Sequence, residues 1–335
     1  PLFLGQLLQQ FYNMADAWVI GNFASNDAFA AVSSGGSLTF LVIGFFNGIA
    51  VGGGVVISRY FGAQDRDNTQ KAIHTAFLFG ILSSLVATLV GLVLIPWMLV
   101  KMGTPDNVLP YSLRYFRVYF GGVTTIILYN ICMAIMHALG DSLRPLYYLA
   151  LSSAVNVVLD LLFVAVFQWD VTGAAVATVI AQGLSVLLCI YQMRKEKEDY
   201  LRLNFRHLTW DKAMMARVIR QGLPTGIQNA VISLGNVVIQ SNINSFGAYA
   251  MSGQGAYTKI EGFAFLPVTG MSMTLPTFIS QNLGAGNVKR AKKGAVFGAV
   301  SAMAAAELIG IAMFLWAPQM LRGFISDPES IAYGV

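Results

Sequence analysis

Two acidic residues interrupt long apolar stretches of this sequence. Asp16 lies in "FYNMADAWVIGNF" (residues 11–23) and Asp160 lies in "AVNVVLDLLF", and neither stretch contains a lysine or an arginine. A charged side chain inside an apolar helix costs on the order of 3 kcal/mol, so such residues usually face the protein interior and mark the path of an ion or a substrate. Paired carboxylates in a low-dielectric interior favour a bound proton or a hard cation such as Na⁺. The two aspartates therefore predict a cation site.

Polar residues at helical spacing give this site further partners. Asn156 precedes Asp160 by four residues and Tyr12 precedes Asp16 by four residues, which places each pair on one helix face. Asn130 in "LYNICMA" and Thr178 in "AAVATVIAQ" lie in two other apolar segments. Asn130 and Thr178 taken alone are as easily explained by hydrogen bonds between helices. We predict that Asp16, Asp160, Asn156, Asn130, Thr178 and Tyr12 converge, with Na⁺, if it binds, held by Asp16, Asn156, Asp160 and Thr178.

The composition is that of an integral membrane protein. Hydrophobic residues make up 56% of the 335 residues and charged residues 11%, and the mean hydropathy is +0.63. This leaves too few charges to coat a soluble globule. Cys132 and Cys189 both lie in apolar runs without metal-ligand spacing, so they predict neither a disulfide framework nor a zinc site.

Apolar segments long enough to cross a bilayer are predicted as helices. They cover residues 1–23, 32–57, 72–100, 115–138, 145–167, 172–193, 218–246, 254–282 and 294–317, and a tenth begins near the end. Lysine and arginine concentrate in every second loop, above all in residues 58–71, 194–220 and 289–293. The positive-inside rule makes these loops cytoplasmic. The net charge of +5 is thus a topology signal and does not indicate a nucleic-acid partner.

Two halves are predicted on either side of the polar segment that follows the sixth span. "ISRYFGAQD", which begins at residue 57, recurs as "ISQNLGAGN", which begins at residue 279, an offset of 222 residues. Asn13 and Phe23 match Asn236 and Phe246 at an offset of 223. Six spans separate the matched positions, so both halves point the same way across the membrane, as in transporters built from parallel repeats. We expect an N-terminal six-helix bundle (1–193), a cytoplasmic linker (194–217) and an incomplete C-terminal bundle (218–335), and we expect both termini to be truncated.

The chain resembles the multidrug and toxic compound extrusion (MATE) transporters over essentially its whole length. The resemblance rests on "QQFYNMADAWVIGNF", "GGGVVISRYFGAQD", "HALGDSLRPLYY", "NVVLD" and "QNLGAGNVKRAKK". It is nearest to the bacterial branch with coupling carboxylates in the N-terminal half, and it implies two six-helix bundles related by a pseudo-two-fold axis along the membrane normal. In that branch the residues that form the cation cluster correspond to Asp16, Asn156, Asp160, Asn130 and Thr178, with Tyr12 beside them. Pro1 corresponds to a first-helix proline whose bending has been proposed to accompany protonation.

One position departs from another branch of the same family. That branch carries a glutamate on helix seven, where this chain has Ile232 in "GLPTGIQNAVIS". A second cation site in the C-terminal half is therefore not expected.

Residues of the C-terminal half are predicted to line a substrate cavity. They are Glu261, Gln228, Tyr257, Met271 and Met273, with Phe263 and Phe265 nearby. Methionine and aromatic rings suit promiscuous apolar cations, although such residues are more often packing or lipid-facing. Lys259 beside Glu261 is equally compatible with a headgroup anchor, and Glu307 has no nameable partner. His74, His137 and His207 show no spacing for a metal site or a catalytic triad.

Three functions are compatible with these features. The first is a secondary antiporter of the cell (plasma or inner) membrane that exports small amphipathic or cationic compounds in exchange for H⁺ or Na⁺, without a cofactor. The second is a lipid-linked saccharide flippase of the same superfamily, which needs a basic cavity that the spans do not supply. The third is a membrane-embedded enzyme, for which no motif is present. We expect a monomer in contact with membrane lipids.

Overall fold

The computed structural model describes residues 1–25, 28, 31–32, 36–101, 104, 106–205, 208–244, 246, 248–323 and 327–335. These residues form helices and connecting segments, without a strand among them. The helices are α1 (Leu2–Phe23), α3 (Gly36–Gly62), α4 (Arg66–Lys101), α5 (Leu109–Gly121), α6 (Val123–Ala138), α7 (Leu143–Asp160), the π-helix η1 (Leu161–Val166), α8 (Asp170–Arg194), the short 3₁₀-helix η2 (Asp199–Leu201), α9 (Lys212–Asn244), α10 (Ala248–Ala264), α11 (Leu266–Gly284), α12 (Val288–Arg322) and α13 (Pro328–Gly334).

Over the described residues, the predicted membrane spans lie on helices. In the described part of the chain, five helices are long and apolar enough to cross a bilayer, and two bent pairs raise this to seven. One pair is α5 and α6, which meet at an angle of 47° around Gly122. Two further helices, α1 and α9, are long but less apolar. For α1 the reason is a row of polar side chains that line an internal cavity.

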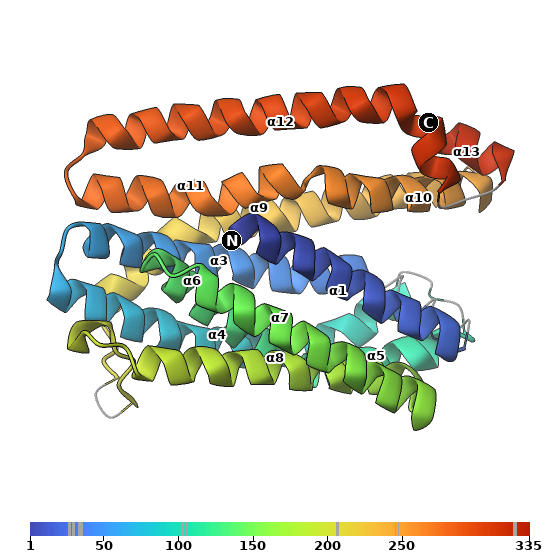
Figure 1. Ribbon diagram of the computed structural model, residues 1–335. Coiled ribbons are helices and arrows are strands. Elements are labelled where there is room, and N and C mark those ends of the chain that lie inside the picture. Colours follow the sequence, from blue (N-terminus) through green and yellow to red (C-terminus); the bar gives the residue numbers. More distant parts are fainter. Residues whose placement is uncertain are drawn as a thin grey trace.

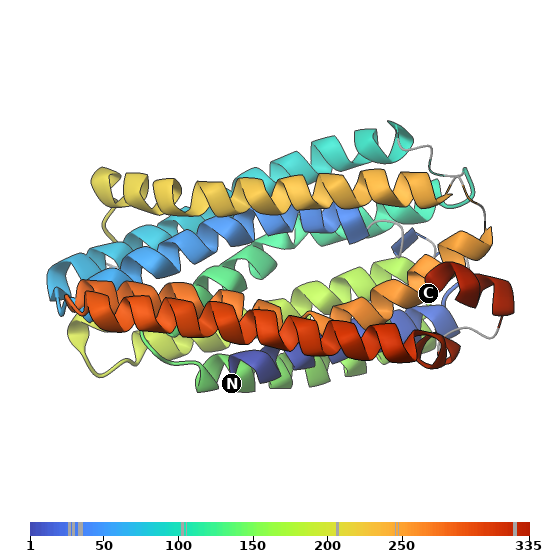
Figure 2. The same ribbon diagram turned by 90° about the horizontal axis from the view of Figure 1, so that it is seen from above.

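The helices form two bundles, as predicted for the fold class. Helices α1 to α8 make the first bundle, and α9 to α13 belong to the second (Figure 1). The continuous apolar core lies in the first bundle and includes fully buried Ile73, Phe77 and Phe120. In the second bundle, α12 lies on the outside against α11 (Figures 1 and 2). Its apolar side chains point outward, as Phe314 does with 85% of its surface exposed, which is typical of a membrane helix.

The turns that join α3 to α4 and α11 to α12 have the same local structure, and both lie at the left end of the molecule in Figure 1. In the first, Ala63 N donates to Arg59 O (3.1 Å), and in the second Ala285 N donates to Gln281 O (3.0 Å). A left-handed residue follows in each case, Gln64 with φ 56° and Gly286 with φ 72°. Each residue of the first turn is 222 positions before its equivalent in the second turn, so the predicted repeat is confirmed at these turns. Its two copies lie at the same end of the molecule.

The side chains that start the next helix repeat as well. Asp65 Oδ1 accepts from Asn68 N (3.2 Å), and Asn287 Oδ1 accepts from Arg290 N (3.1 Å). Both are N-caps, which satisfy a backbone N–H at the start of a helix. The same helix-turn-helix unit is therefore built twice by different residues.

The two bundles touch most closely where α3 crosses α9. A Cβ atom at Gly48 would overlap the backbone of Gly226, and a Cβ atom at Gly52 would overlap the backbone of Gly222. Small residues at membrane helix crossings let the backbones approach closely. The four glycines hold the two bundles together along one side of the cavity.

Candidate functional site

Asp16 and Asp160 come from two neighbouring helices of the first bundle. Asp16 lies in α1, and Asp160 is the last residue of α7 before the π-helix η1 begins at Leu161. Short π-helical segments occur frequently at functional sites. Here the change in helical pitch directly follows the buried carboxylate, which no feature of the sequence predicted.

The two carboxyl groups are close neighbours and interact electrostatically. Asn156 Nδ2 donates to Asp160 Oδ2 (2.8 Å) when the amide is oriented so that its oxygen accepts from Thr178 N (3.3 Å). Tyr12 Oη donates to Thr178 Oγ1 (3.4 Å). Five of the six predicted cation-site residues are thus joined in one network, which draws on α1, α7 and α8.

The network still has unused acceptors. Asn156 and Asp160 are fully buried. Within this site, Asp16 Oδ1 and Asp160 Oδ1 are buried and have no hydrogen-bond partner. A buried acceptor without a partner is costly. Two carboxyl groups in contact also need a positive charge between them to avoid repulsion. This donor set fits a proton, or a hard cation that takes oxygen ligands.

Asn130, the sixth predicted residue, takes no part in this network. Its Nδ2 donates to Ile126 O of its own helix (2.9 Å). The side chain lines the same cavity as Asp16. Its assignment as a cation ligand remains a prediction from the family resemblance.

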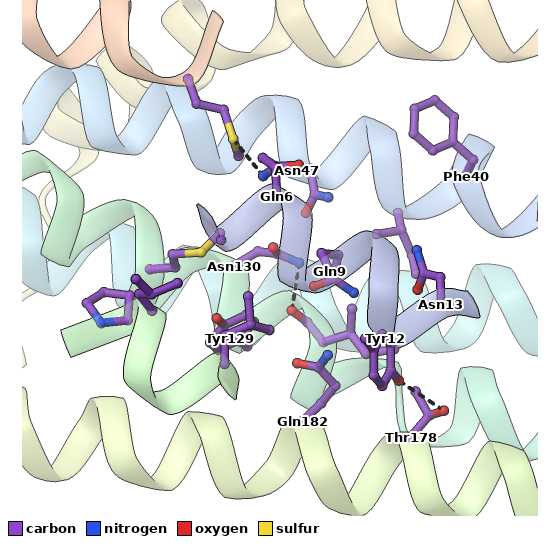
Figure 3. A pocket seen from close by; sticks show the side chains of 18 of the residues that line it. Gln6, Gln9, Tyr12, Asn13, Phe40, Asn47, Tyr129, Asn130, Thr178 and Gln182 are labelled. Carbon is purple, nitrogen blue, oxygen red and sulfur yellow. Dashed lines mark hydrogen bonds between the residues drawn. The ribbon is translucent and has the colours of Figure 1, made fainter. Parts of the chain in front are cut away.

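A cavity of about 560 Å³ lies beside the carboxylate pair. Figure 3 shows polar side chains that line it, among them Gln9, Asn13 and Gln182. Asp16, Tyr12 and Thr178 form part of its wall, whereas Asp160 lies behind them. Sequence reasoning missed many of the polar residues that line it: Gln6, Gln9, Asn13, Asn47, Tyr115, Tyr119, Tyr129, His137 and Gln182. A signal existed for α1, because Gln6, Gln9, Asn13 and Asp16 recur at intervals of three and four residues and share one helix face. Nothing in the sequence placed α5 and its tyrosines at this site.

The C-terminal half contributes little to this cavity. Met273 of α11 lines it and accepts a hydrogen bond from Gln6 Nε2 at 3.0 Å. Met271 and Gln228 are not among the lining residues, and Gln228 is exposed. Tyr257 Oη donates to Glu261 Oε1 (3.3 Å) within α10, and Tyr257 lines a separate pocket of about 180 Å³. Of the predicted substrate residues, only Met273 lies at the cavity.

The remaining predicted residues lie apart from the carboxylate pair. Pro1 lines the cavity at the start of α1, and its carbonyl accepts from Gly5 N (2.8 Å). Glu307 is exposed on α12, and His74 is buried beside Arg202 O at 3.3 Å. His207 and the side chain of Lys259 lie outside the described residues. The described residues hold no group of three or more His, Cys, Asp and Glu side chains that could bind a metal ion.

Comparisons with known proteins agree with this architecture. A family model described as MatE matches residues 1–162 and 224–335. The chain is 28% identical over 334 residues to the probable multidrug resistance protein YpnP of Bacillus subtilis (strain 168), a match that covers 100% of this chain and 74% of that protein. It is 24% identical over 343 residues to the FAD transporter of Shewanella oneidensis, with 99% and 74% covered.

Solved structures of transporters have the same fold as this chain. A MOP superfamily transporter from Pyrococcus furiosus, described by a reversed polarity of its binding pocket, has a TM-score of 0.90 at 22% identity. A multidrug resistance MATE family transporter in an outward-facing conformation has a TM-score of 0.90 at 21% identity. Each comparison covers 100% of this chain and 74% of the other. At these identities the likeness establishes the two-bundle fold.

Proposed function

The chain belongs to the MatE family, and from that premise we propose that it is a secondary transporter that exports amphipathic, cationic compounds in exchange for a cation. The observation that carries the proposal is that Asp16 on the cavity wall adjoins Asp160 behind it, and each carboxyl group keeps one buried oxygen without a partner. A bound cation neutralises this pair. Binding a cation to one conformation more tightly than to another shifts the balance between them, which links ion movement to substrate movement.

The contact between the carboxyl groups favours H⁺ as the coupling ion. Two neighbouring carboxyl groups can share one proton, which supplies the donor that a carboxylate lacks and removes the repulsion between two negative charges. Na⁺ remains the second possibility because Asp16, Asp160, Asn156 and Thr178 together present oxygen ligands. Tyr12 and Asn156 hold the pair in place through Thr178 and Asp160.

The polarity of the cavity supports a cationic substrate. The described lining residues include Asp16 and four tyrosines, Tyr12, Tyr115, Tyr119 and Tyr129, but no lysine or arginine. Aromatic faces and a carboxylate attract organic cations. Asn47 Oδ1 and Gln182 Oε1 are buried without partners and offer acceptors to a substrate N–H group.

The same polarity argues against anionic cargo. The flavin dinucleotide named for the Shewanella relative and the pyrophosphate of a lipid-linked saccharide both carry phosphates, which proteins bind with arginine and lysine. The described part of this cavity supplies only His137 as a basic group. A flippase or dinucleotide transporter is therefore the weaker reading for this chain.

The test is efflux of ethidium from proteoliposomes under proton and sodium gradients imposed separately. We expect the inward proton gradient to drive ethidium out at a rate well above that of vesicles without a gradient. Efflux driven by sodium alone would assign Na⁺ as the coupling ion. Equal rates with and without either gradient would contradict cation-coupled export.

A further inference from the structure

The two copies of the repeated turn touch each other, and the contact is reciprocal. A Cβ atom placed on Gly62 would overlap the backbone carbonyl of Gln281, and a Cβ atom placed on Gly284 would overlap the backbone carbonyl of Arg59. Gly62 corresponds to Gly284 and Arg59 corresponds to Gln281 at the repeat offset of 222 residues. Each glycine therefore meets the equivalent carbonyl of the opposite copy. Such self-complementary pairing is the signature of a two-fold axis through the contact.

This contact leaves no space for any side chain at either glycine. The overlapping atoms belong to the backbone of the opposite turn, which cannot rotate away as the end of a flexible side chain could. By contrast, a Cβ atom on Gly310, in the middle of α12, would meet nothing within 4 Å. Close approach at Gly62 and Gly284 is thus a specific demand of this contact.

Hydrogen bonds to one carbonyl join three helix ends at the same place. Gln281 Nε2 of the second bundle donates to Ala138 O, the last residue of α6 in the first bundle (2.9 Å). Ser58 Oγ of α3 donates to the same oxygen (3.5 Å). We define the cytoplasmic seal as Gly62, Gly284, Gln281 and the carbonyl of Ala138. It lies at the end of the molecule that carries the basic loops after α3 and α11 and is therefore predicted to face the cytoplasm.

The seal adjoins the cavity directly. His137 lines the cavity, and the next residue of α6 supplies the carbonyl that both bundles share. The seal therefore lies between the cavity and this end of the molecule. A contact on the axis between two halves is also the one that must break when the halves tilt apart at that end.

We propose that Gly62 and Gly284 are positioning residues that close the cavity toward the cytoplasm, and that their contact must open for a substrate to enter from that side. The inference rests on the proposed export function, because only a carrier that alternates between two openings needs a seal that breaks. A methyl group on either glycine acts as a wedge between the bundles. Loss of the Gln281 side-chain amide weakens the same seal without adding bulk.

The test measures access to the cavity and needs neither a drug nor an ion gradient. In a background with Cys132→Ala and Cys189→Ala, a single cysteine replaces Met133, which lines the cavity on α6. Inverted vesicles are treated with a membrane-impermeant maleimide, and the rate of labelling at this cysteine is measured. We expect Gly62→Ala and Gly284→Ala each to raise the rate about fivefold or more, on the order of 1 kcal/mol in the opening equilibrium. The double variant should be little faster than either one, because both wedge the same contact.

Two further variants make the result decisive. Gly310→Ala is the matched control and should leave the labelling rate unchanged. Gln281→Leu should raise the rate by a smaller factor, and it decides the question if the glycine variants fail to fold. Unchanged labelling in folded Gly62→Ala, Gly284→Ala and Gln281→Leu protein would overturn the seal. Because the assay contains no gradient, a failure of ion-coupled efflux would leave this result standing.

Discussion

The carboxyl group of Asp16 on α1 lies next to that of Asp160 at the end of α7. The residues are 144 positions apart in the chain, yet they form one buried unit with Asn156, Thr178 and Tyr12. Residues that act as one unit have non-additive effects when they are replaced. This relationship leads to the first prediction.

We expect Asp160→Asn to reduce gradient-driven ethidium efflux by about tenfold or more, and Asp16→Asn with Asp160→Asn to be little worse than either change alone. Each change removes one titratable group from a pair that must act together. Efflux rates in proteoliposomes measure the effect. Asp67→Asn, an exposed change in the first turn of α4, is the control. If the fold-reduction of the efflux rate in the double variant equals the product of the two single reductions, the two carboxylates act independently.

The link from Tyr12 to Thr178 should tune this unit without being essential to it. Tyr12→Phe removes the 3.4 Å hydrogen bond to Thr178 Oγ1 but keeps the ring. Since one hydrogen bond contributes roughly 0.5–1.5 kcal/mol, we expect a two- to tenfold lower efflux rate and a shifted pH profile. Tyr147→Phe, at an exposed tyrosine of α7, serves as the control. An unchanged pH profile in Tyr12→Phe would separate this tyrosine from the cation site.

Most residues of the proposed cation site could be predicted from the sequence. Acidic residues inside apolar segments are costly, so Asp16 and Asp160 stood out, and four-residue spacing tied Tyr12 and Asn156 to them. Asn130 shows the limit of this reasoning, because an amide in a membrane helix can bond its own backbone, as it does at Ile126. The spacing of polar residues along one helix does not reveal which hydrogen-bond partner each side chain will find.

The cavity was much less accessible. Tyr115 and Tyr119 reach it because α5 meets α6 at an angle of 47°, and sequence periodicity carries no information about such bends. Glu261 was predicted at the cavity but pairs with Tyr257 on α10. The fold itself was predictable because apolar spans, basic loops and the repeat at residues 57 and 279 all agree.

Topology offers a third prediction. A cysteine at Asn204, exposed in the segment between α8 and α9, should react with an impermeant maleimide in inverted vesicles but not in intact cells. A cysteine at Asp106, exposed between α4 and α5, should show the opposite pattern. The native Cys132 and Cys189 are buried and should stay unlabelled in both. Labelling of Asn204→Cys from outside intact cells would invert the proposed orientation.

The contact between α3 and α9 leads to a prediction about stability. Gly48→Ala places a methyl group on the backbone of Gly226, and overpacking of this kind costs about 1–3 kcal/mol. We expect a lower melting temperature for the detergent-solubilised protein. Gly235→Ala, in open space on α9, should leave the melting temperature unchanged or raise it slightly. Equal melting temperatures for the two variants would show that the crossing is looser than the structure indicates.

We propose that Asp16 couples ion movement to export, and a comparison of Asp16→Asn with the native protein measures this coupling. Ethidium efflux from proteoliposomes is followed under an imposed proton gradient and, separately, under an imposed sodium gradient, together with ethidium binding. Because the amide keeps the size of the side chain but cannot release a proton, we predict that the variant inserts and binds ethidium but loses efflux under both gradients. Efflux at the native rate under both gradients would contradict ion coupling through Asp16 and would make Asp16 a structural residue.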